Sequence, residues 1–200
     1  MSLVSKTKDE KVMVFIDVRN IIRSMKRECP GPFMVDFVEL VKQLSGNRNL
    51  RGAYCFDGKG TKDNPTENIV FHKNLQKDGF RMIVRDSYDS DEREQKEVDV
   101  SMALEMYEQA VNNGFDTAII VSGDRDFVPA VEKLQSLGKK VEVASFYSSR
   151  SSDLYRAADE CYNLSKLPII QACEPIEETI EEMQSDIPSS NDMIELTEAI

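Results

Sequence analysis

Short apolar runs alternate along the chain with longer amphipathic stretches. The apolar runs lie at residues 12–16, 52–56, 80–84, 117–121 and 141–145. After each run, apolar residues recur at the spacing of a helix face, which predicts helices near 66–78, 97–112, 126–137 and 151–160 and in the segment after the first run. Five strand–helix repeats are typical of a parallel sheet with right-handed crossovers and helices on both faces. The pattern therefore predicts an α/β fold.

The same pattern ranks the strands by burial. The runs at 12–16 and 117–121 lack polar alternation and predict interior strands, whereas the run at 80–84 alternates and suits a more exposed position. Pro30-Gly31-Pro32 divides the first crossover into two helices. Polar loops at 57–66 and 86–95 follow strands, so we expect both at the carboxyl edge of the sheet, where open α/β folds bind ligands.

Composition fits one domain of a protein that does not enter membranes. The chain has 200 residues, of which 40% are hydrophobic and 30% charged, and no apolar run approaches the roughly 18 residues that span a bilayer. We expect a cytoplasmic protein. Its four cysteines form no CxxC pair and it has one histidine, which leaves almost no ligand set for zinc or an iron–sulfur cluster.

The negative charge is concentrated at one end. The net charge is −11, yet residues 171–200 hold nine acidic residues and no Lys or Arg, so the rest of the chain is nearly neutral and can carry a basic face. We divide the chain into a flexible terminus at 1–10, a domain at 11–167 and an acidic tail at 168–200. Apolar residues at helical spacing in the tail predict a short amphipathic helix that binds a protein partner or shields the basic face.

Aspartates follow both interior strands. Asp17 ends the first, and Asp124 and Asp126 follow the other in the sequence S-G-D-R-D-F. A single Asp in such a position is explained equally well as a helix N-cap. Two aspartates together with Ser122 are more than capping requires, which favours a ligand site.

Asp99 supplies a fourth carboxylate. We expect the helix over 97–112 to bury a stripe of Val100, Ala103, Leu104, Tyr107 and Val111, with Asp99 on its inward flank. The alternative is that Asp99 only stabilises the helix dipole.

Convergence of the four aspartates would require compensation. Carboxylates about 5 Å apart repel by about 3 kcal/mol per pair at an effective dielectric constant near 20. Such a cluster needs raised pKa values or a cation, and an all-oxygen ligand set favours Mg²⁺ or Mn²⁺. A metal there could activate water against a phosphodiester, so the pattern predicts hydrolysis of a nucleic-acid backbone.

Three motifs in order carry a family resemblance. They are V-M-V-F-I-D-V-R-N, K-E-V-D-V-S-M-A-L-E-M and F-D-T-A-I-I-V-S-G-D-R-D-F-V-P-A-V, followed by L-G-K-K-V-E-V-A-S-F. Over residues 11–167 the chain resembles the NYN domain, in the LabA-like branch of the PIN-like nuclease superfamily. The resemblance implies a three-layer PIN-like sandwich with about five strands in the order 3-2-1-4-5. It also implies an Mg²⁺- or Mn²⁺-dependent ribonuclease in which Asp17, Asp99, Asp124 and Asp126 bind metal and catalyse, assisted by Asn20 and Ser122.

Basic residues near these motifs suggest where RNA would lie. Arg19, Arg23, Lys26 and Arg27 form a stripe if their segment is helical, and Lys96 and Arg125 lie at the same edge. They could neutralise phosphates of single-stranded or structured RNA, although most charge runs are only solvated helix faces.

Two other functions and one assembly state stay open at this point. A non-catalytic RNA-binding module would keep the same fold. A haloacid-dehalogenase-type phosphatase is disfavoured, because its second aspartate would fall at Arg19. A homodimer is also left open by the sequence.

Overall fold

The computed structural model describes residues 7–58, 68–85 and 91–172. Its elements, with η for a 3-10 helix, are β1 (Lys11–Asp17), α1 (Val18–Glu28), β2 (Phe33–Val35), α2 (Phe37–Ser45), β3 (Asn49–Gly58), α3 (Ile69–Lys77), β4 (Arg81–Arg85), α4 (Asp91–Val111), β5 (Thr117–Val121), η1 (Arg125–Phe127), α5 (Val128–Ser136), β6 (Lys140–Ser145), η2 (Tyr147–Ser149), α6 (Ser152–Ala157), β7 (Glu160–Asn163), η3 (Leu164–Lys166) and β8 (Ile170–Ala172). In this part of the chain, no helix is long and apolar enough to cross a membrane.

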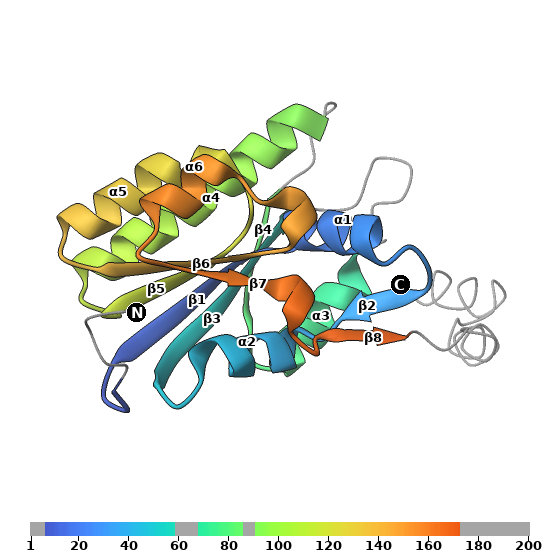
Figure 1. Cartoon of the computed structure of the whole chain (residues 1–200), viewed down its shortest axis with the longest axis horizontal. Coiled ribbons are helices and arrows are strands. Elements are labelled where there is room, and N and C mark those ends of the chain that lie inside the picture. The colour runs from blue at the N-terminus through green and yellow to red at the C-terminus, as the bar shows by residue number, and fades with distance from the viewer. Residues whose placement is uncertain (1–6, 59–67, 86–90, 173–200) are drawn as a thin grey trace, which may run out of the picture.

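A parallel sheet forms the centre of the molecule, with strand order β4-β3-β1-β5-β6-β7. The five strands expected from sequence are β1, β3, β4, β5 and β6, and they lie in the expected order. A sixth, β7, follows α6 and extends one edge. Helices α4, α5 and α6 cover one face of the sheet and α2 and α3 the other (Figure 1). The predicted α/β fold is confirmed.

The interior strands are apolar throughout because both of their faces are covered. In β1, Val14 and Ile16 pack on the side of α1 and α2, and Met13 and Phe15 on the side of α4 and α5. Each of these four side chains is at most 5% exposed. This double burial explains why the strand shows no polar alternation.

Helix α4 buries a different face from the one expected. Its buried residues are Val98, Met102, Met106 and Ala110, whereas the predicted stripe faces outward, with Leu104 63% exposed. The prediction of that stripe was wrong because α4 carries apolar residues at helical spacing on two faces, and periodicity alone does not say which face meets the sheet. The other members of the exposed stripe are Val100, Tyr107 and Val111, with Ala103 half-buried.

The chain returns to the domain after Pro168. Ile169 is fully buried, and β8 pairs antiparallel with β2, so the first residues of the predicted tail pack against the domain. Residues 173–200, where the amphipathic helix was predicted, lie outside the described residues. So does most of the two predicted polar loops.

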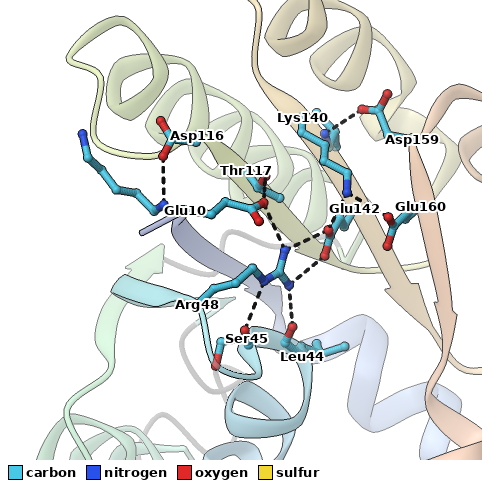
Figure 2. Close-up of polar contacts among 12 residues, drawn as sticks. Glu10, Leu44, Ser45, Arg48, Asp116, Thr117, Lys140, Glu142, Asp159 and Glu160 are labelled. Atoms are coloured by element: carbon cyan, nitrogen blue, oxygen red, sulfur yellow. Dashed lines mark hydrogen bonds and ion pairs between the residues drawn. The ribbon is translucent and has the colours of Figure 1, made fainter. Parts of the chain in front are cut away.

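A buried ion pair ties the sheet together near its amino edge (Figure 2). Arg48, just after α2, donates from its two terminal nitrogens to the carboxylate oxygens of Glu142 in β6, at 2.8 and 2.9 Å. It also donates to the carbonyls of Leu44 and Ser45. Lys140 lies 3.2 Å from the same carboxylate, which is fully buried. The network clamps α2 to the sheet away from its carboxyl edge.

Candidate active site

Asp17 lies where the two central strands end. Ile16 of β1 is paired with Val121 of β5, so Asp17 and Ser122 are neighbours at the carboxyl edge. One carboxylate oxygen of Asp17 accepts the backbone N–H of Asn20 at 3.0 Å, which caps α1. The other accepts the Ser122 hydroxyl at 3.1 Å. Asp17 is therefore both a helix cap and a bridge to the β5 turn.

The turn after β5 is held by its own polar side chains. The Ser122 hydroxyl oxygen accepts the N–H of Asp124 at 3.2 Å, and Asp124 in turn caps η1 through the N–H of Asp126 at 3.0 Å. The side-chain oxygen of Asn20 accepts the N–H of Gly123 at 3.2 Å. Asn20 and Ser122 thus connect the two aspartate-bearing segments.

Gly123 is required by a close approach. A Cβ atom at this position would lie 2.1 Å from the carbonyl oxygen of Ser149 in η2. The Gly123 carbonyl accepts the N–H of Ser151. Absence of a side chain therefore lets the segment after β6 brace the turn that carries Asp124.

Asp99 reaches the same region from the first half of α4. Its Oδ1 atom is buried and has no hydrogen-bond partner. Burial, and then the charges of Asp17, Asp124 and Asp126, raise the pKa of Asp99 to about 7. An unpartnered buried carboxylate oxygen is unusual in a folded protein and calls for an explanation.

The charges of these aspartates act on one another. Burial raises the pKa of Asp17 to about 6, with smaller effects from the charges of Asp124 and Asp57 and opposition from the hydrogen bonds to Asn20 and Ser122. The structure therefore brings the four predicted aspartates into one electrostatic neighbourhood, from β1, α4 and the β5 turn.

The carboxylates do not form a finished metal cage. Within the described ranges, no three His, Cys, Asp or Glu side chains are grouped closely enough to hold an ion. The donor chemistry nevertheless suits a hard cation, because every candidate ligand is a carboxylate oxygen and Asp99 Oδ1 lacks a partner. An ion bound here would have to draw the carboxylates closer together.

Two residues beside the site were missed from the sequence. Asp57, near the end of β3, is buried and lies 2.8 Å from Nε2 of His72 in α3. Its other oxygen accepts the N–H of Gly58 and lies 3.8 Å from Nε of Arg19. Asp57 follows the strand next to β1, which was an available signal. The contact with His72, which is buried rather than at the surface, has no local sequence signal.

The predicted basic residues border this edge. Arg19 is half-buried beside Asp57, and Arg23 is exposed on the outer face of α1. Lys96 is exposed on α4, and Arg125 is exposed in η1, 3.9 Å from Asp153. These side chains surround the aspartates with positive charge on two sides.

Comparison with known proteins agrees with this geometry. The sequence model of the NYN domain matches residues 11–165. The chain belongs to the NYN domain family. Its six-stranded parallel sheet flanked by helices is the PIN-like nuclease fold of that family.

Two similar proteins are themselves without an assigned function. Over 63 residues the NYN domain is 40% identical to the uncharacterized protein MJ0482 of Methanocaldococcus jannaschii, a match that spans 32% of this chain and only 26% of that protein. A crystal structure of a protein of unknown function, VPA0982 from Vibrio parahaemolyticus, superposes with a TM-score of 0.66 at 23% identity. It covers 80% of this chain and 96% of that chain, and supports the fold alone.

Proposed function

We propose that this NYN domain, which its motifs place in the LabA-like branch, is an Mg²⁺- or Mn²⁺-dependent ribonuclease. One observation carries the proposal: the buried, unpartnered oxygen of Asp99 lies within the electrostatic reach of three further carboxylates. Helix capping accounts for one oxygen each of Asp17 and Asp124, but nothing in a capping role accounts for Asp99. A divalent cation would give that oxygen a partner and offset the mutual repulsion.

Asp17, Asp99 and Asp124 would hold the ion. When bound, it would polarise the phosphodiester and lower the pKa of the attacking water. Asn20 and Ser122 keep the Asp17 carboxylate and the β5 turn in register through their hydrogen bonds.

Asp126 has a separate role in this scheme. It is exposed at the start of η1, so its carboxylate is open to solvent and placed to accept a proton from water. Its backbone N–H is fixed by the Asp124 carboxylate, which orients this part of the turn.

The basic side chains would bind the RNA backbone. Arg19, Arg23, Lys96 and Arg125 lie beside the carboxylates on α1, α4 and η1. Lys and Arg at this spacing neutralise phosphates without reading sequence, so the binding constant should fall steeply with salt.

The proposal is tested by cleavage of end-labelled single-stranded RNA in Mn²⁺. We expect the wild type to cleave and the Asp17→Asn/Asp124→Asn double variant to be inactive. Asp36→Asn is the matched control, because Asp36 caps α2 through the N–H of Glu39 just as Asp17 caps α1, but lies outside the site. Equal cleavage by the wild type and the double variant would refute the assignment.

A second candidate function is an RNA-binding module that does not cleave. The observation in its favour is that no closed metal cage exists among the described side chains. Tight RNA binding that is unchanged by EDTA, with no product in Mn²⁺, would favour this alternative over the ribonuclease.

A further inference from the structure

A groove between α4 and α5 opens beside the carboxylates. Its volume is about 330 Å³, and its walls include Val100, Leu104 and Tyr107 from α4 and Asp126 and Lys133 from η1 and α5. These α4 residues belong to the stripe that faces away from the sheet, and Tyr107 is 41% exposed and Leu104 63%. A groove of this size is in the range of small-ligand pockets and much smaller than a protein-binding face.

The groove is continuous with the site described above. Asp126 is a wall of the groove and also one of the charges that raise the pKa of Asp99. Val100 directly follows Asp99, and Leu104 lies one turn further along α4, about 6 Å at 1.5 Å per residue. A group that enters the groove therefore lies within one nucleotide of a phosphate at the carboxylates.

We infer that the groove takes the nucleobase adjacent to the phosphate that is cleaved. This inference rests on the proposed ribonuclease function and assigns part of its substrate site. An aromatic ring and flat apolar walls match the face of a base, and stacking of this kind tolerates any base. Between the helices, Ala103 and Ala130 contribute only small side chains to the groove walls.

Lys133 adds a polar contact to this apolar surface. Its ammonium lies 5.9 Å from the centre of the Tyr107 ring. Placed there, it reaches the edge of a ring stacked on Tyr107, where the carbonyl oxygens and ring nitrogens of a base accept hydrogen bonds. A purely apolar partner would leave this charge without a use.

The test compares RNA oligonucleotides that each lack one base. Binding of labelled 12-mers, each with a single abasic position, is measured by fluorescence anisotropy in Ca²⁺, over a time in which no product forms. For the wild type we expect one position, next to the cleaved bond, where loss of the base weakens binding about fivefold or more. For Tyr107→Ala the intact RNA should bind correspondingly less tightly, and removal of that base should have less than about a twofold further effect.

Val111→Ala is the matched control. Val111 belongs to the same exposed stripe, at the last residue of α4, but does not line the groove. It should bind every oligonucleotide like the wild type. Equal weakening at all abasic positions, an abasic effect that persists in Tyr107→Ala, or a loss of affinity in Val111→Ala equal to that in Tyr107→Ala would each overturn the inference.

Two further readings separate the remaining outcomes. Conversion of a dimer to a monomer by Leu104→Ser, measured by analytical ultracentrifugation, would show that the groove is a contact between copies and would overturn the base assignment. Failure of the ribonuclease function would appear as absence of cleavage by the wild type. The abasic comparison is read from binding alone, so it fails or succeeds separately.

Discussion

Replacing Asp17 by Asn should stabilise the protein at neutral and alkaline pH. The carboxylate of Asp17 is 3% exposed, and its burial disfavours the charged form. Asn keeps an oxygen that caps α1 as well as Asp does. It also removes the charge that Asp99 and Asp124 repel. The substitution thus separates the energetic cost of the site from its local structural role.

The size of the effect follows from the shift in pKa. A carboxyl group with a pKa of about 6 in the folded protein and 3.8 in the unfolded chain destabilises the folded state by about 3 kcal/mol once the pH exceeds both values. The sign is negative for the wild type, because between these values the folded state binds more protons than the unfolded chain. Stability is therefore lost as the pH rises through that window. Between about pH 4.5 and pH 8, the advantage of Asp17→Asn should grow by about 2 kcal/mol.

Urea unfolding of both proteins across this pH range measures the effect. The quantity to compare is the difference in unfolding free energy between variant and wild type, because ionisations common to both cancel. A difference that stays constant with pH, or a variant that is less stable than the wild type at pH 8, would refute the account of Asp17 as a charge held at a cost.

Three further predictions concern the turn, the ion pair and the metal. Gly123→Ala should destabilise the fold by about 1–3 kcal/mol or more, measured by thermal unfolding, because its Cβ would meet the Ser149 carbonyl. Arg48→Met should cost about 3–5 kcal/mol by leaving Glu142 buried with weaker partners, and adding Glu142→Leu should recover part of that loss. Mn²⁺ should raise the melting temperature at pH 8 but not at pH 5, where Asp17 and Asp99, with pKa values of about 6 and 7, are protonated.

The sheet and the strand-end carboxylates were accessible from sequence because they depend on local patterns. Continuous apolar runs identified β1 and β5 as interior strands, and Asp17 and Asp124 follow from where those strands end. The orientation of α4 was not accessible, since two of its faces are apolar and only the volume beneath the sheet selects the one with Met102. Nor was the contact between Asp57 and His72, which joins residues 15 apart through tertiary packing.

Pairing of β2 with β8 has a practical consequence for expressing the domain by itself. The family match stops at residue 165, but Ile169 is fully buried and the N–H of Asp36 bonds to its carbonyl. A chain shortened to the family boundary would strip β2 of its only recorded partner strand in the described part of the molecule and expose Val35 to water. Removal of the acidic segment should therefore begin after Ala172, so that any gain in RNA affinity is not confused with partial unfolding.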